Sequence, residues 1–147
     1  MRALLQRVSE AQVTVSGRLV GQIGRGALVF LGVKRDDNRA NAEYLAKKIT
    51  SLRIFPDENG RNNLSLVDIG GGLLVVSQFT LYADTQRGNR PSYANAAPAE
   101  LAEPLYEHFI QCCEPLCPEV QRGAFGAHMQ VSLVNDGPIT ILCSSDR

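Results

Sequence analysis

Apolar residues in the first third of the chain either alternate with polar ones or form short continuous runs, and both patterns predict β-strands. Val13 and Val15 alternate with polar neighbours, as in a strand with one buried face. The letters "SGR" then indicate a turn before a short strand, "LVGQI". The run from Gly26 to Val33 is continuously apolar, which predicts a strand that is covered on both faces. We therefore expect an amino-terminal part made of strands joined by turns.

A change of period after this strand predicts the first helix. Leu45, Ile49 and Leu52 recur at helical spacing. Asp37 or Asn38 can cap its start, because short polar side chains accept hydrogen bonds from the first free amides of a helix.

A second helix is expected after Pro98, which suits a first helical turn. Pro104 removes a backbone donor inside this helix, so we expect the regular part to start late or to kink there. The residues expected on its core face are Leu101, Leu105, Phe109 and Cys112.

Strand patterns return in the second half of the chain. The apolar run 73–76 follows "GGG" and predicts a buried strand. Near the end, "QVSL" and "ITILC" flank "NDGP", which predicts a hairpin. The fold class is therefore mixed α/β: a single domain, 1–147, with a strand-rich, barrel-like sheet body, largely antiparallel or mixed pairing, and two main helices.

Composition narrows the function. Fifteen basic and fifteen acidic residues give a net charge of zero, which argues against binding of nucleic acid by bulk positive charge but leaves capture of a nucleic-acid end open. The chain has no apolar run of about eighteen residues and no charged-then-apolar leader, so we expect neither a membrane span nor secretion. Its 147 residues suffice for one domain with a sizeable core.

Four cysteines raise the question of a metal site. Their spacing is not CxxC, and neither His108 nor His128 completes a zinc pattern. We interpret them as reduced thiols, some of them core residues, and expect no metal. The four are Cys112, Cys113, Cys117 and Cys143.

Polar side chains interrupt the end of the most hydrophobic strand, in "SQFTL". If the strand continued, Gln78, Thr80 and Tyr82 would share one face. Burying such a group without a partner costs about 1–3 kcal/mol, so this strand end either frays into a polar loop or faces a cavity. No His, Cys or carboxylate lies beside Thr80 in sequence to activate it, and a serine-protease-like triad is not visible.

The stretch "NDGPIT" is the second candidate motif. Pro138 cannot donate to a β-ladder, which indicates an edge or an exposed tip. Gly137 has no Cβ, so its backbone can approach a ligand closely. On pattern alone, an ordinary hairpin explains both residues.

Three stretches in register, "MRALLQRVSEAQVTV", "SQFTLYAD" and "GAFGAHMQVSLVNDGPIT", closely resemble the D-aminoacyl-tRNA deacylase family over essentially the whole chain. Ile139 stands where the family often has Val and preserves a β-branched residue. The resemblance implies hydrolysis of the ester between a D-amino acid and the terminal ribose of tRNA, and also of glycine mischarged on tRNA-Ala. It also implies a cytoplasmic homodimer that needs no cofactor or metal, with its active site at the subunit interface.

The resemblance also implies roles for individual residues. Gly137 and Pro138, joined by a cis bond, would enter the partner's pocket and reject L side chains. Either Thr80 attacks the ester, or water attacks with help from the ribose 2′-hydroxyl while backbone amides stabilise the oxyanion. Arg87 and Arg90 are either phosphate contacts or solvated loop charges. The catalytic candidates are Thr80, Phe79 and Gln78; the substrate-binding candidates are Ser77, Phe125, Met129, Gly137 and Pro138.

A reading from another class stays open. The chain could be a non-catalytic module that binds a tRNA end or a nucleotide on the same fold, because a fold can keep its pocket without its chemistry. The intact "SQFT" and "GPIT" stretches argue against it.

Overall fold

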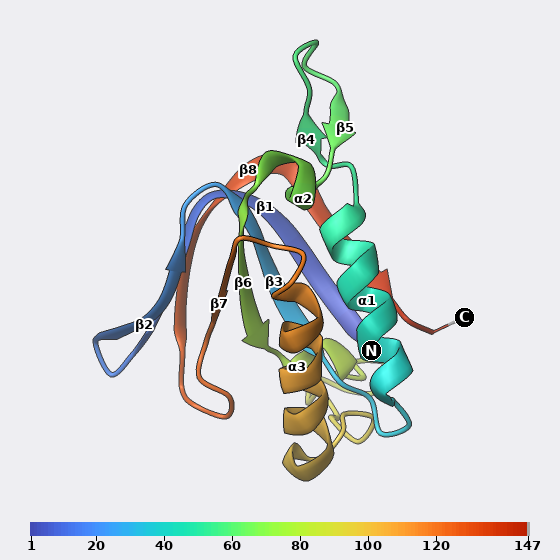
Figure 1. The fold of residues 1–147 in the computed structure, drawn as a ribbon. Helices are drawn as coiled ribbons and strands as arrows, with labels where there is room; N and C mark the ends of the chain where they lie inside the picture. The colour runs from blue at the N-terminus through green and yellow to red at the C-terminus, as the bar shows by residue number, and fades with distance from the viewer. Residues whose placement is uncertain (147) are drawn as a thin grey trace.

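The computed structural model describes residues 1–146. Strands and helices follow one another in the chain as shown in Figure 1. The elements are β1 (Arg2–Val15), β2 (Arg18–Ile23), β3 (Gly26–Gly32), α1 (Arg39–Ser51), β4 (Phe55–Pro56), β5 (Asn62–Leu64), α2 (Leu66–Ile69), β6 (Gly72–Ser77), the 3₁₀ helix η1 (Phe79–Tyr82), α3 (Ala99–Cys113), β7 (Glu119–Arg122) and β8 (Gln130–Ser144).

The main sheet has the strand order β2-β1-β3-β6-β7, and β8 pairs with β1 as well. The strands β2, β3 and β8 are antiparallel to β1, whereas β3–β6 and β6–β7 are parallel. The sheet curls until β2 meets β7: a Cβ on Gly21 would lie 2.5 Å from the Arg122 carbonyl oxygen. The expected mixed, barrel-like sheet with its two main helices is confirmed, and α2 adds a third, short helix.

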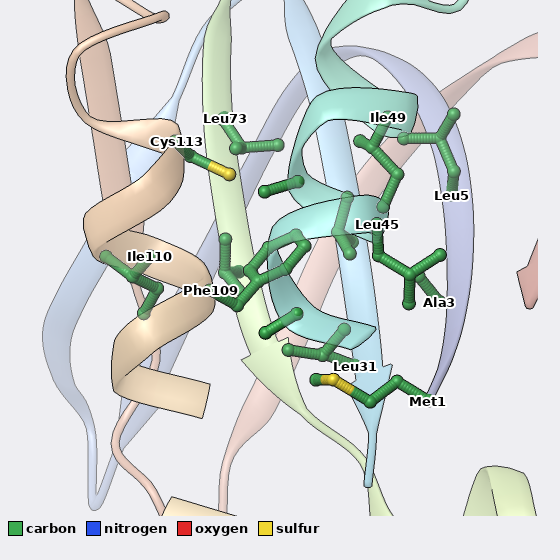
Figure 2. Close-up of a cluster of buried hydrophobic side chains, with 14 of the residues drawn as sticks. Met1, Ala3, Leu5, Leu31, Leu45, Ile49, Leu73, Phe109, Ile110 and Cys113 are labelled. Atoms are coloured by element: carbon green, nitrogen blue, oxygen red, sulfur yellow. The ribbon is translucent and has the colours of Figure 1, made fainter. Parts of the chain in front are cut away.

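Both faces of β3 and β6 are buried, as the continuous apolar run predicts. Val29 and Val75 face a large core beneath α1 and α3, whereas Leu28 and Leu74 face a smaller core inside the curled sheet. Figure 2 shows the larger core, where side chains of α1 and α3 meet those of β1, β3 and β6. Alternation along a strand explains the two cores, because successive side chains point to opposite faces.

Asn38, one of the two caps that the sequence offers, caps the start of α1 at Arg39. The Asn38 side chain accepts a hydrogen bond from the Ala40 amide at 2.9 Å. Asp37 is buried and instead accepts from the ammonium of Met1 and from the Lys34 amide, both at 2.6 Å. This arrangement gives the buried carboxylate a charged partner and a hydrogen bond, which a buried charge requires.

The helix α3 differs from the prediction in where it starts and in its last core residue. It starts at Ala99 and runs through Pro104, so the expected late start is wrong. Pro104 and Glu100, whose carbonyl loses its helical partner, are both exposed, and water can therefore satisfy that carbonyl. Leu105 and Phe109 are buried as predicted, whereas the last core position is the fully buried Cys113 rather than the half-buried Cys112.

The expected hairpin at "NDGP" is wrong, because β8 is one strand from Gln130 to Ser144. Both of its halves pair antiparallel with β1, so the chain does not reverse. Gln6 pairs with Thr140 and Val8 with Asn135, so two steps along β1 lie opposite five along β8. The surplus residues form a bulge, which we call the 136–138 bulge.

Other small features have no clear signal in the sequence. The β4–β5 pair and β7 are short, and α2 spans a single turn. No helix within residues 1–146 is long and apolar enough to cross a membrane.

The four cysteines are free, and burial of Cys113 and Cys117 confirms that some of them are core residues.

Candidate functional site

The polar end of β6 turns into a 3₁₀ helix. The strand ends at Ser77, and η1 begins at Phe79 after Gln78, whose φ is −147°. The alternation of faces expected as far as Tyr82 is therefore wrong, because a 3₁₀ helix has three residues per turn. The turn nevertheless keeps the side chains of Gln78 and Thr80 together: the Gln78 carboxamide Nε2 donates to the Thr80 hydroxyl.

Two backbone amides at the start of η1 are free to bind a ligand. The first amides of a helix have no partner within it. Within residues 1–146, no acceptor binds the amides of Phe79 or Thr80, whereas the neighbouring Gln78 amide donates to the Leu31 carbonyl at 2.8 Å. Two adjacent free N–H groups form a donor pair of the kind that stabilises a developing oxyanion.

A cavity of about 440 Å³ opens beside these amides. Its walls come from the ends of β3 and β6, from the start of α3 and from the segment before β8, which lie together in Figure 1. Most of the lining is apolar, and Ser77, Gln78 and His128 add polar side chains. The predicted site residues that line it are Ser77, Gln78, Phe79, Phe125 and Met129.

Thr80 lies next to this lining rather than in it. Its hydroxyl contacts Gln78, and no His, Cys or carboxylate side chain within residues 1–146 hydrogen-bonds to it. Within the same residues, no three His, Cys, Asp or Glu side chains gather as metal ligands. Ser77, Gln78 and His128 line the cavity with polar side chains, and together with the two free amides they are candidates to act on a bound ligand.

Tyr106 is a pocket residue that sequence reasoning missed. It lines the cavity, its hydroxyl donates to the Val75 carbonyl at 3.0 Å, and its ring lies 5.6 Å from that of Phe125, centroid to centroid. It occurs on α3 at the spacing of core residues, and helical periodicity does not distinguish a core position from a pocket wall. Tyr106 is identified as a pocket residue only by its contact with Phe125, which is distant in sequence and also lines the cavity.

Burial of Tyr106 predicts a loss of stability in alkali. Desolvation raises the pKa of its phenol from 10.0 to about 12. Because the folded pKa is the higher one, this contribution is complete below pH 10 and is lost as the pH rises towards 12. We expect the melting temperature to fall over this range, and to fall less steeply in Tyr106→Phe. Thermal unfolding followed by circular dichroism measures both, with Tyr93→Phe, an exposed phenol, as the control; identical slopes for all three proteins would contradict the prediction.

The 136–138 bulge lies apart from this cavity. Gly137 and Pro138 are exposed, and the peptide bond between them is cis, as predicted. Neither residue lines the pocket of its own chain. Within one chain, the structure therefore does not bring the two predicted halves of the site together.

Arg7 holds the bulge in place from β1. Arg7 as a whole residue is 7% exposed, and its guanidinium donates to the carbonyls of Asp136 at 3.1 Å and Gly137 at 3.2 Å. It also donates to the carbonyl of Ile54 at 2.6 Å and to the side chain of Asn62 at 3.1 Å. One planar cation thus ties the bulge to the start of the β4–β5 region. No sequence pattern singled out Arg7.

The chain matches known proteins over its full length. The model of the D-Tyr-tRNA(Tyr) deacylase family matches residues 4–144. A D-aminoacyl-tRNA deacylase of Thermosipho africanus is 57% identical over 147 residues, covering 100% of this chain and 99% of the relative. A D-aminoacyl-tRNA deacylase of Roseiflexus castenholzii is 61% identical over 145 residues, covering 99% and 92%.

Two solved structures share the fold. A protein described as c-Myc DNA unwinding element binding protein is 40% identical, with a TM-score of 0.94 and 100% of both chains covered. A probable eukaryotic D-amino acid tRNA deacylase is 17% identical, with a TM-score of 0.83 over 97% of both chains, which supports the fold alone. Family model, relatives and fold agree, and the chain belongs to the D-Tyr-tRNA(Tyr) deacylase family.

Proposed function

We propose that this protein hydrolyses the ester between a D-amino acid and the terminal ribose of tRNA, releasing free tRNA and amino acid. The observation that carries the proposal is the donor pair of Phe79 and Thr80 beside an apolar cavity of about 440 Å³. A volume of this order suits a small organic group such as an aminoacylated nucleoside. Family membership supplies the substrate, since the relatives are named D-aminoacyl-tRNA deacylases.

In the proposed site, each wall of the cavity contacts a different part of the substrate. Phe125 and Met129 offer apolar surface to the terminal adenosine. The amides of Phe79 and Thr80 point at the ester carbonyl, where negative charge develops during attack. Gln78, held against the Thr80 hydroxyl, keeps the start of η1 in place.

Water is the proposed nucleophile, assisted by the ribose 2′-hydroxyl of the substrate. A hydroxyl side chain is a weak nucleophile unless a base takes its proton. No described His or carboxylate reaches the Thr80 hydroxyl, and the group that contacts it, the Gln78 amide nitrogen, is a donor. The protein then contributes positioning and oxyanion stabilisation.

Thr80→Ala therefore separates the two mechanisms. If water attacks, the variant keeps its activity on D-Tyr-tRNA to within about tenfold, a loss of the size of one hydrogen bond. Substrate that ends in 2′-deoxyadenosine reacts more slowly with both proteins. Single-turnover kinetics measure this. An inactive Thr80→Ala, or an acyl group trapped on Thr80 of the wild type, would show that Thr80 is the nucleophile.

The chiral gate is proposed to come from a second copy of the chain. Gly137 and Pro138 are exposed and do not line their own pocket, so a two-fold dimer can place them in the partner's pocket, with two equivalent sites. Their backbone would then lie against the substrate Cα and leave no room for an L side chain. Glycine has no side chain to exclude, so glycyl-tRNA mischarged on tRNA-Ala would also be a substrate. The place of action would be the cytoplasm, where aminoacyl-tRNA is made.

One experiment tests the activity. D-Tyr-tRNA and L-Tyr-tRNA are incubated with the protein, with and without a chelator, and loss of the ester is followed. We expect the D ester to be cleaved at least about tenfold faster than the L ester, a lower bound for rejection by steric clash, and chelator to change neither rate. Equal rates, or no cleavage, would refute the deacylase proposal. Tight binding of tRNA ends without cleavage would favour the non-catalytic module instead.

A further inference from the structure

Two exposed aromatic side chains stand at the mouth of the pocket. Phe79 is 56% exposed and Tyr93 is 43% exposed, and their ring centroids lie 5.1 Å apart in an edge-to-face arrangement. Phe79 also lines the cavity. Exposed apolar groups that continue a pocket mark an interaction surface. The pair therefore extends the pocket wall to the outside of the molecule.

The loop between the two rings carries positive charge. Asp84 and Ser92 exchange two backbone hydrogen bonds, at 2.8 and 2.9 Å, which close the loop and bring Tyr93 back beside η1. Arg87 and Arg90 lie in this loop and are exposed. Neither guanidinium has an ion-pair or hydrogen-bond partner within residues 1–146. Both remain free to bind phosphate oxygens.

We propose that Phe79 and Tyr93 form a stacking platform for the cytosine that precedes the terminal adenosine of tRNA, while Arg87 and Arg90 bind the phosphates on its 5′ side. This inference rests on the proposed function, which places the terminal adenosine and its ester inside the cavity. The RNA chain then leaves through the mouth, and its next base meets the aromatic pair first.

The physical requirements of single-strand binding are met at this place. Such sites combine aromatic rings, on which bases stack, with cations that follow the backbone. In this edge-to-face arrangement, with an interplanar angle of 76°, the edge of one ring covers one face of the other, and the exposure of both rings leaves aromatic surface for a base. A local pair of arginines also reconciles RNA binding with a net charge of zero.

Equilibrium binding tests the platform without any hydrolysis. Adenosine 5′-monophosphate and the trinucleotide CCA are titrated into the full chain by calorimetry. The wild type is expected to bind CCA about tenfold more tightly than the mononucleotide, and Tyr93→Ala to lose most of that advantage, as base stacking predicts. Tyr93→Phe keeps the advantage, and binding of the mononucleotide is unchanged in both variants. Leu19→Ala, an exposed apolar residue of β2, is the matched control and binds CCA like the wild type.

Two outcomes overturn the platform. One is equal affinity of the wild type and Tyr93→Ala for CCA. The other is a lower light-scattering mass of Tyr93→Ala, which makes the aromatic pair a subunit contact. Cleavage of D-Tyr-tRNA is measured separately: a cleaving wild type with no CCA advantage refutes the platform alone. A non-cleaving wild type whose CCA advantage depends on Tyr93 refutes the deacylase proposal and supports the platform.

Discussion

Gly137→Ala is expected to lower kcat/KM for D-Tyr-tRNA by about 100-fold, the size of effect that a misplacement of about 1 Å at a reacting centre produces. A Cβ built on Gly137 meets no atom within 4 Å, so the fold accommodates the methyl group. In the proposed dimer, that methyl group enters the partner's pocket beside the substrate Cα. Activity then falls for D-aminoacyl and glycyl substrates alike, while the melting temperature stays within about 2 °C of the wild type, as for a change of a few tenths of a kcal/mol. Initial rates and thermal unfolding measure the two effects.

Gly24→Ala is the matched control, because Gly24 also has open space around its Cβ direction and lies away from the cavity. It is expected to keep full activity. Light scattering should give twice the 16.0 kDa chain mass for the wild type and for both variants. A fully active Gly137→Ala, or an active monomer, would refute the gate that a second copy supplies.

Arg7→Met is expected to lower the free energy of unfolding by about 3 kcal/mol, because several carbonyls lose a charged donor and each hydrogen bond to a charged group contributes about 1.5–3 kcal/mol. The variant keeps the length of the side chain but loses the guanidinium that binds the Asp136 and Gly137 carbonyls and the buried carbonyl of Ile54. Urea denaturation measures the change. Activity measured where the variant is still folded should fall as well, because the 136–138 bulge loses its brace.

Arg53→Met provides the control on the same side of the fold. Arg53 is exposed, and its guanidinium donates to Asn63 at 3.3 Å. Such surface changes stay within about 0.5 kcal/mol. Equal stability of Arg7→Met and the control would mean that water replaces the contacts of Arg7 at no cost. Arg7→Lys, which keeps the charge without the planar fork, should lie between the two.

The sequence correctly predicted those elements whose pattern of buried residues lies within one short segment. The run at Gly26–Gly32 and the helical spacing of Leu45 and Ile49 each reflect burial of one short segment. The Asp-Gly turn signal failed because long-range pairing overrode it. Both halves of β8 pair with β1, and the surplus residues leave the ladder as a bulge. A turn preference of two residues cannot compete with so many hydrogen bonds to a distant strand.

Some residues of the candidate site were predicted from the sequence, and others were missed. Ser77, Gln78 and Phe79, which line the cavity, were predicted from the family resemblance, because the polar strand end alone left both a fraying loop and a cavity open. Tyr106 and Arg7 were missed because their roles depend on residues far away in sequence, Val75 and Gly137. The turn of the chain into η1 was missed as well, and that turn leaves two amides free.

The pairing of β1 with β8 also has a consequence for synthesis. Arg2 lies opposite Ser144 and Thr14 opposite Gln130, so β1 is synthesised long before the strand with which it pairs. Contacts between such distant segments are slow to form, because closing the loop between them is unfavourable before the contacts repay it. A ribosome-bound chain that stops short of residue 130 exposes the unpaired edge of β1 along the whole strand. We therefore expect the nascent protein to depend on chaperones until β8 emerges, and arrest at increasing chain lengths to reveal an abrupt gain of protease resistance at that point.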